Sequence, residues 1–467
     1  MQRREFLATV AAAPQVMRTG GALLRAGAAT AVITPALGAS LAGYFTERFS
    51  IDNHDELLAK ALVFDNGSMR AGLVLCDLCV LPPEVVAAAK FRVAREAGVP
   101  EEALLIAATH THSAPATMHL FQSQADRQYL DFLTGRIVDS VRMAVRRLAP
   151  ARIATGFGRE DSLVFNRRFY MKPGAIPPNP FGGIETVRMN PGVGNPDIVK
   201  EAGPVDPIVG LLAVTAADGS PLALVGNYSL HYVGGERANE VSADYFGYWA
   251  SAMARHAGAG PNFVAMLTNG CQGDINNVDV RRPAPKLEPY QKMQQVAVTL
   301  AAECARVMKT LQFSASAELG ASREWVDCGV RLPSSAQVDA ARAVLHGVAS
   351  PYRDARHVFA RETLIIAQEF PPVFRAEVQA LRIGDLFLAS MTGEPFVELG
   401  LDIRARLKGR AVFPIGLANG HAGYVPTVRA HEEGGYETWL AKSSFLDRDA
   451  TPRLVEAMTR RLGMIGA

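Results

Sequence analysis

The 467-residue sequence lacks long hydrophobic runs, an excess of one charge and a cysteine framework. No segment approaches the roughly 18 uninterrupted apolar residues of a membrane-spanning helix, so we expect no transmembrane segment. The 48 basic and 46 acidic residues leave a net charge of +2, which argues against nucleic acid as a partner. Five scattered cysteines define no disulfide framework, and we expect them to be core residues.

The composition is that of a globular protein with a large core, at 49% hydrophobic and 20% charged residues. Length alone allows about three domains, but no repeat or low-complexity linker divides the chain. Short apolar runs alternate with amphipathic stretches, which predicts one layered α/β domain of mixed β-sheets flanked by helices. Strands are expected at 61–64, 72–75, 104–108, 153–156, 210–215, 222–228, 263–267, 376–383, 386–390 and 412–417, and helices at 83–97, 127–148, 291–311, 336–348 and 396–407.

The N-terminal 25 residues have the features of a twin-arginine export signal. Arg3 and Arg4 precede the apolar stretch 6–13, which ends in an Ala-x-Ala cleavage candidate at 11–13. We therefore expect residues 1–25 to be a leader, residues 26–467 to be the catalytic domain, and the protein to be periplasmic or secreted. The alternative is a basic N-terminus on a cytoplasmic protein, because the apolar stretch is short.

One segment, 172–207, is rich in proline and glycine and carries no clear periodicity. Structureless spans of this length are uncommon inside compact domains and usually belong to a binding or active site. We expect a long loop that lies over a site.

The strongest local signal is a pair of histidines, His110 and His112, directly after the apolar run 104–108. In an extended chain two residues at this spacing point to the same side. The carboxyl ends of strands are where α/β folds bind ligands. Two imidazoles there suit a metal ion, or one ligand and one proton donor.

A metal site needs further ligands from distant parts of the chain. His231 follows the apolar run 222–230, and Glu394 follows the expected strand 386–390. Each also fits an ordinary strand-end residue, so their spacing alone leaves both interpretations open. We therefore expect the metal site, if present, at the carboxyl ends of several strands.

An ordered series of motifs makes the sequence resemble the catalytic domain of the neutral/alkaline non-lysosomal ceramidases. The resemblance spans roughly residues 26–440. Its motifs are the segment 26–38 with Gly43 and Tyr44, His54 and Asp55, the motif 109–115, Asn166 with Arg167, the segment 226–231, Ser242 with Asp244, Gly273 with Asp274, Gly393 with Glu394, and the segment 424–427 with Tyr436.

The resemblance implies a Zn²⁺ cofactor and assigns a role to each site residue. Its zinc ligands correspond to His110, His231, Glu394 and Tyr424. The other site residues correspond to His112, which contacts substrate and water, and to Arg167 and Tyr436 as hydrogen-bond donors. Asn276 is outside this correspondence, and we expect it to position the substrate. His421, close to Tyr424 in sequence, is a further residue that could support the site.

The sequence departs from the family at the serine that ceramidases use for amide hydrolysis, because Asn276 stands there and Asn277 replaces the proline. An asparagine cannot act as a nucleophile. We also expect no C-terminal immunoglobulin-like domain. These features predict a ceramidase-like zinc hydrolase of amide (N-acyl) or ester bonds that uses metal-bound water, with ceramide itself in doubt as substrate.

Two other functions remain open. A metal-dependent lyase or isomerase of a sugar-like or other polar substrate would use the same metal with His112 as acid and base. A catalytically silent metal-binding or ligand-binding protein would need no reaction at all. In each case the expected partner is a small or lipid-like molecule, with a place in lipid metabolism for the ceramidase-like hydrolase, and the oligomeric state is open.

Overall fold

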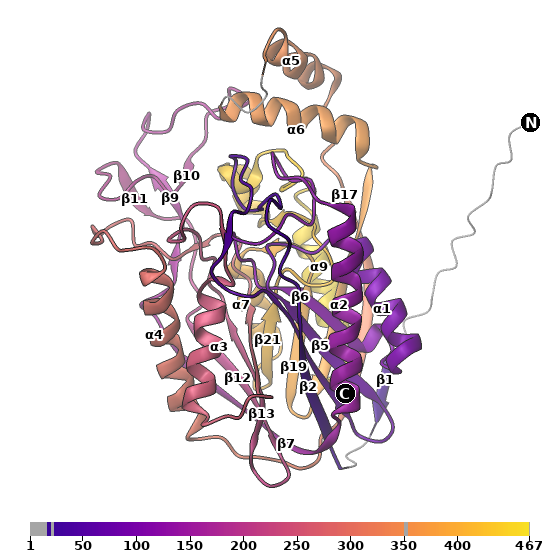
Figure 1. The fold of residues 1–467 in the computed structure, drawn as a ribbon. Helices are drawn as coiled ribbons and strands as arrows, with labels where there is room; N and C mark the ends of the chain where they lie inside the picture. The colour runs from indigo at the N-terminus through magenta and orange to yellow at the C-terminus, as the bar shows by residue number, and fades with distance from the viewer. Residues whose placement is uncertain (1–15, 20–22, 350–353, 467) are drawn as a thin grey trace, which may run out of the picture.

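The computed structural model describes residues 16–19, 23–349 and 354–466. Its largest sheet has eight strands in the order β15, β13, β12, β7, β2, β4, β5, β6 and mixes parallel and antiparallel pairs (Figure 1). The strands are β2 (Arg25–Val32), β4 (Leu58–Asp65), β5 (Arg70–Cys76), β6 (Leu104–Ala108), β7 (Ala149–Arg159), β12 (Ile208–Ala216), β13 (Pro221–Tyr228) and β15 (Val264–Asn269).

A second sheet of five strands packs against the first, in the order β1, β17, β18, β19, β21. These strands are β1 (Val16–Thr19), β17 (Leu319–Gly329), β18 (Val373–Ile383), β19 (Leu386–Met391) and β21 (Ala411–Ile415). Apolar side chains of both sheets form one buried cluster, with Leu212 and Val225 from the first sheet and Leu381 and Phe413 from the second. The sheets therefore bury one face of each against the other.

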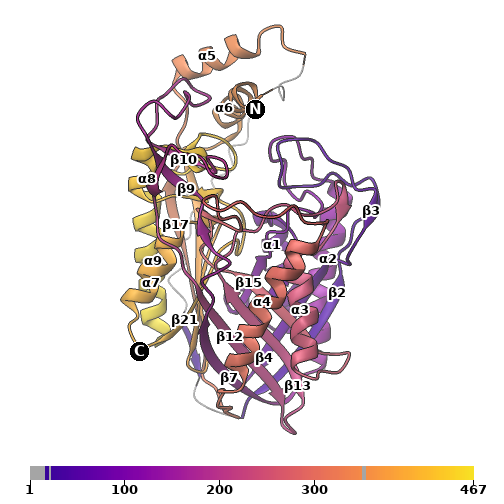
Figure 2. The ribbon, with the colours of Figure 1, turned by 90° about the vertical axis from the view of Figure 1, so that its left-hand side faces the viewer.

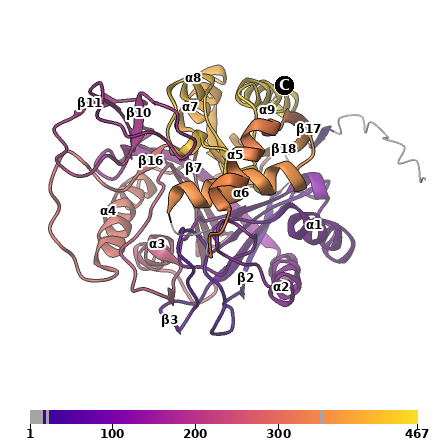
Figure 3. The same cartoon turned by 90° about the horizontal axis from the view of Figure 1, so that it is seen from above.

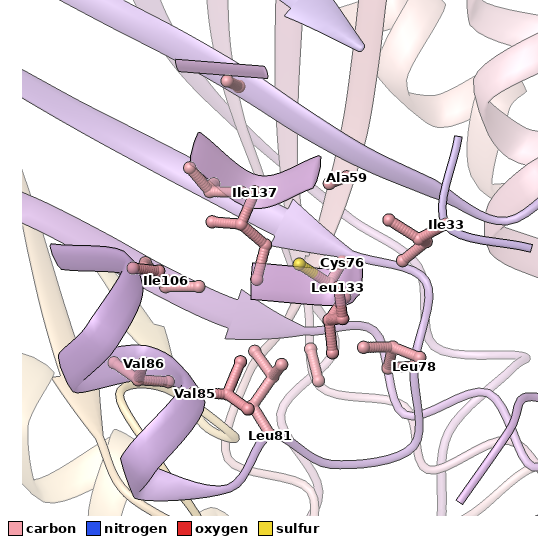
Figure 4. Close-up of a cluster of buried hydrophobic side chains, with 14 of the residues drawn as sticks. Ile33, Ala59, Cys76, Leu78, Leu81, Val85, Val86, Ile106, Leu133 and Ile137 are labelled. Atoms are coloured by element: carbon pink, nitrogen blue, oxygen red, sulfur yellow. The ribbon is translucent and has the colours of Figure 1, made fainter. Parts of the chain in front are cut away.

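Helices cover the outer faces of the two sheets, which gives four layers (Figure 2). The first sheet carries α1 (Pro83–Ala97), α2 (Arg127–Arg146), α3 (Asp244–His256) and α4 (Gln291–Met308), and the second carries α7 (Val397–Arg406) and α9 (Ala450–Gly466). Under α1 and α2, side chains such as Val85, Leu133 and Ile137 pack on Cys76 and Ile106 of the sheet (Figure 4).

Local sequence explains where α1 and α2 begin and end. Pro83, at the first position of α1, has no N–H that would need a partner, and Gly98 ends the helix with a left-handed φ of 65°. The side chain of Asp126 accepts a hydrogen bond from the Gln128 N–H at the start of α2. Apolar residues at helical spacing then place one face of α2 on the sheet.

The predicted fold class is confirmed, and all ten predicted strands and five predicted helices coincide with elements of the structure. The sequence reading missed β2, β17, α3, α6 (Ala355–Glu369) and α9. In β2 the obstacle is the run of alanines and glycine, residue types with low strand propensity. Gly27 is needed there because a Cβ would lie 2.1 Å from the Ala144 carbonyl oxygen of α2.

The segment 172–207 is more ordered than expected. It contains β10 (Val187–Met189) and β11 (Ile198–Glu201), which pair with the two edges of β9 (Arg168–Met171). This small sheet also contacts the C-terminal part of the chain, where the Thr186 N–H donates to the Glu433 carbonyl at 3.1 Å.

The arginine pair of the expected leader lies outside the described residues, and β1 and the first residue of β2 belong to the sheets. The boundary at residue 25 and export remain predictions. All five cysteines are free and buried, as expected. Among the described residues, none of the helices is both long and apolar enough to cross a membrane.

The carboxyl ends of β6, β15 and β21 meet, because hydrogen bonds join the residues there: the Asn269 amide donates to the Thr109 carbonyl at 3.2 Å, and the Ala108 N–H donates to the Leu417 carbonyl at 3.1 Å. β13 runs parallel to β15, and β19 runs parallel to β21, so these strands end there too. Seen from that end, α5 (Ser335–Leu345) and α6 lie over the centre of the molecule (Figure 3). Phe359 of α6 contacts Phe45 and Phe121 with ring centres 6.3 and 6.0 Å apart. The region between the strand ends and α6 holds the candidate site.

Candidate metal centre

His110 and His112 lie in the turn that follows β6. The expectation of an extended segment is wrong, because His110 has a φ of 76° and its N–H donates to the Leu78 carbonyl at 2.8 Å. The two imidazoles nevertheless meet, with their Nε2 atoms 3.2 Å apart and their rings perpendicular. The left-handed turn thus brings together the two side chains that the sequence pattern had paired.

Glu394 lies between His110 and His231. Its Oε2 is 3.3 Å from His110 Nε2 and 3.7 Å from His231 Nδ1. All three side chains are buried, and their ligand atoms lie within 4.8 Å of one another. Within the described residues, Glu394 Oε2 has no hydrogen-bond partner. A buried carboxylate oxygen in this position fits a metal ligand.

Tyr424 is held next to Glu394 by a short pair of parallel strands, β20 (Glu394–Pro395) and β22 (Tyr424–Val425). The Glu394 N–H donates to the Gly423 carbonyl at 2.8 Å, and the Tyr424 N–H donates to the Ser443 carbonyl at 2.7 Å. The ring of Tyr436 lies 5.7 Å from that of Tyr424. Tyr424 thus lines the same cavity as His110 and Glu394. Two imidazoles and a carboxylate meet in one cluster, donors that suit Zn²⁺, and Tyr424 as a fourth ligand remains a prediction.

The electrostatics of the ligand candidates are coupled. Burial opposes the charged form of Glu394, but His110, His421 and Arg167 together outweigh it and lower the pKa of Glu394 to about 2. Burial likewise opposes protonation of His110, but Glu394 raises its pKa well above the usual value. Burial and the charge of Arg167 lower the pKa of His231. Without metal, His110 and Glu394 form an ion pair and His231 is neutral.

His112 differs from His110 in its surroundings. Burial and the charge of His110 lower the pKa of His112 to about 3. Its Nδ1 has no hydrogen-bond partner in the described part of the chain. Gly43, with a φ of 96°, packs directly on this ring, since a Cβ there would lie 2.5 Å from His112 Cγ. His112 is thus a neutral imidazole at the edge of the cluster.

Arg167 is anchored by an acid that the sequence analysis missed, Glu437. Arg167 Nε donates to Glu437 Oε1 at 2.7 Å, and Arg168 Nη1 donates to Glu437 Oε2 at 2.8 Å. Arg167 Nη1 also lies 3.1 Å from His231 Nδ1, and its guanidinium carbon lies 5.2 Å from the centre of the Tyr424 ring. In the sequence, the position of Glu437 directly after the predicted site residue Tyr436 could have indicated that it lies near the site.

The side chains of His110, His112 and Glu394 border a cavity of about 70 Å³. His110, His112, Glu394, Tyr424 and Tyr436 contribute to its wall, as predicted site residues. Its apolar wall is made by Phe45, Val80, Leu120 and Phe121, and its remaining polar lining includes Tyr44, Cys79, His421 and Ser443. Cys79 was expected only as a core residue, yet its Sγ lies 3.7 Å from His110 Nδ1.

Asn276, like His231 and Arg167, is not among the described residues that line the cavity. Its amide donates to Asn190 Oδ1 at 2.7 Å. It lies in β16 (Ile275–Asn276), which pairs with β8 (Phe165–Asn166), next to Arg167. Asp274 has a structural role that the sequence did not reveal. Its carboxylate accepts hydrogen bonds from the Asn166 side-chain amide and from the Val397 N–H. A role for Asn276 with substrate remains a prediction.

Solved structures of ceramidases share this fold. A crystal structure of neutral ceramidase from Pseudomonas aeruginosa matches with a TM-score of 0.70 and 19% identity over 94% of this chain and 74% of that one. A ceramidase complexed with C2 matches with a TM-score of 0.71 and 19% identity over 94% of this chain and 75% of that one. No family model and no curated protein matches. The ceramidase-like fold is therefore confirmed.

The close approach of β20 and β22 predicts a specific sensitivity at Gly393. A Cβ there would lie 2.3 Å from the Gly423 carbonyl oxygen, and the residue has a φ of 86°. Gly67 has a φ of 85° but open space around it. In urea denaturation, Gly67→Ala should lower the free energy of unfolding by about 1 to 2 kcal/mol through backbone strain. Gly393→Ala should cost about 1 to 3 kcal/mol more through the clash, and equal losses would contradict the close approach.

Proposed function

We propose that this chain is a zinc-dependent hydrolase of an amide (N-acyl) or ester bond. The observation that carries the proposal is the buried group of His110, His231 and Glu394, in which Glu394 Oε2 faces both imidazoles at 3.3 and 3.7 Å. This group stands at the strand ends of a fold shared with ceramidases. A buried carboxylate between two imidazoles is an arrangement that a divalent cation would stabilise.

His110, His231, Glu394 and Tyr424 would hold the Zn²⁺. When bound, Zn²⁺ supplies Lewis acidity, which polarises a substrate carbonyl and activates water for attack near neutral pH. The low pKa of His231 keeps it unprotonated and available as a ligand. His110 must lose its proton to bind the metal, so proton and zinc compete for this side chain.

His112 is the group best placed to move a proton. It lines the cavity, and its Nε2 lies 3.2 Å from His110 Nε2, so it is within reach of a molecule bound beside the cluster. Arg167 has a buried Nη2 that lacks a partner among the described residues. With the Tyr436 hydroxyl, it would donate to the oxygen that becomes negative during attack, an interaction typically worth about 2.7 to 4 kcal/mol of barrier. We propose that Asn276 positions the substrate from the adjacent strand.

The apolar wall of the cavity favours a substrate with a hydrocarbon part. Phe45, Leu120 and Phe121 line the cavity together with the polar residues His110, His112 and Glu394. An N-acyl amide, as in ceramide, combines these two properties. We propose a lipid-like amide as the substrate class and, from the Arg3 and Arg4 pair, export to the periplasm or beyond.

Loss of either histidine ligand should remove the metal. His110→Ala and His231→Ala should each lower zinc affinity at least about 100-fold and abolish activity, because a tetrahedral site cannot close with one ligand missing. Zinc content is measured by mass spectrometry after dialysis against a competing chelator. His256→Ala, at an exposed histidine at the end of α3, is the control and should keep wild-type zinc. Full zinc in the double His110/His231 variant would refute the assignment.

Isotope incorporation separates hydrolysis from the lyase or isomerase alternative. In ¹⁸O-labelled water, the carboxylic acid product of an N-acyl amide should gain one labelled oxygen per turnover, because hydrolysis adds water across the bond. The products are analysed by mass spectrometry against a panel of N-acyl amides, esters and sugar-like substrates. Turnover without label in any product would contradict hydrolysis and favour elimination or isomerisation.

A further inference from the structure

His421 is a buried side chain of the cavity wall that makes no side-chain hydrogen bond to the described residues. It is 3% exposed, and both of its ring nitrogens lack a hydrogen-bond partner within the described residues. It lines the same cavity as Glu394 and His112. Buried polar groups in proteins are nearly always paired with protein, water or ligand. Two unpaired nitrogens on one buried ring of the cavity wall therefore point to a partner inside the cavity, either water or a ligand that displaces it.

The backbone around His421 is bent and fixed on both sides. Leu417 and Asn419 have φ values of 56° and 58°, which non-glycine residues rarely adopt. The Asn419 N–H donates to the Ile106 carbonyl at 2.7 Å, and its side chain accepts from the Ile106 N–H at 3.1 Å. On the other side, the Gly423 carbonyl accepts a hydrogen bond from the Glu394 N–H at 2.8 Å. Strained backbone of this kind is concentrated at functional sites.

A metal ion in the site would leave His421 unpaired. Such an ion would satisfy Glu394 Oε2 and bind His110, His231 and Tyr424, while His112, Arg167 and Tyr436 serve the carbonyl side of the substrate. His421 is outside the group of ligand atoms that lie within 4.8 Å of one another. His421 therefore remains available to bind the nitrogen side of a substrate amide. A neutral imidazole offers one acceptor and one donor.

We propose that His421 is a substrate-binding residue that accepts a hydrogen bond from the substrate N–H and so selects amides over esters. An ester oxygen has no hydrogen to donate and would leave the acceptor nitrogen of His421 unpaired. Sites built to bind a substrate N–H or O–H discriminate strongly against analogues that lack it. This inference rests on the proposed function, because it places the substrate carbonyl at the zinc.

Two small zinc-binding probes test the N–H contact by calorimetry. Acetohydroxamate carries an N–H beside its carbonyl, and N-methylacetohydroxamate does not. With zinc-loaded wild-type protein, methylation should weaken binding at least about 10-fold, as expected for loss of a hydrogen bond to a buried group. With His421→Phe, which keeps a ring of similar shape, the penalty should fall to less than about 3-fold while zinc affinity stays at its wild-type value.

The outcomes separate this inference from the proposed function. An equal methylation penalty in wild type and His421→Phe, with zinc bound in both, overturns the role of His421 alone. Loss of zinc from His421→Phe also overturns it, because His421 would then be a metal ligand. Absence of zinc binding by the wild-type protein refutes the proposed function instead. If His421→Phe does not fold, His421→Leu provides the same comparison.

Discussion

The buried carboxylate of Glu394 is the constraint on which the site depends. Burial of a charged group is costly unless other groups compensate for it. Here compensation comes from His110 and His231, which follow strands of the eight-stranded sheet, whereas Glu394 follows a strand of the five-stranded sheet. The cluster therefore exists only because the two sheets pack face to face with the carboxyl ends of β6, β13 and β19 at the same end.

Irregular segments between the sheets then fix each side chain. The short pair β20 and β22 places Glu394 and Tyr424 opposite one another. Glu437 binds both Arg167 and Arg168 and is fully buried, so it fixes the arginine that approaches His231. Removal of Glu437 would leave the buried guanidinium group of Arg167 without its carboxylate partner, whereas Arg168 would keep Glu433 at 3.7 Å. The rigid four-layer scaffold and these few buried polar contacts together preorganise the site.

The sequence predicted the parts of the protein whose signal is local. Apolar runs such as 104–108 and 386–390 identified strands buried on both faces, and the residues that follow them identified His110 and Glu394. The strand β2 was missed because Gly27 and its alanine neighbours reflect the close packing of α2, which is a tertiary contact. Glu437 was missed because its partner Arg167 lies 270 residues away in the sequence. The role of His421 was left open because its significance depends on the absence of hydrogen-bond partners among the described residues, which the sequence cannot show.

Resemblance carried the site prediction further than spacing could. Nothing local relates Tyr424 to His110, yet the structure places both on one cavity wall. The same reasoning was less informative for Asn276, whose amide binds Asn190 outside that wall. The predicted role of Asn276 therefore depends on contacts that the sequence does not show.

The most direct test of a zinc centre is a crystal structure of the zinc-loaded protein, with diffraction data collected above and below the zinc absorption edge. The account predicts one strong anomalous peak about 2.0 to 2.2 Å from ligand atoms of His110, His231 and Glu394, with Tyr424 as the fourth ligand. A peak elsewhere, or no peak between these three side chains at full zinc loading, would contradict it.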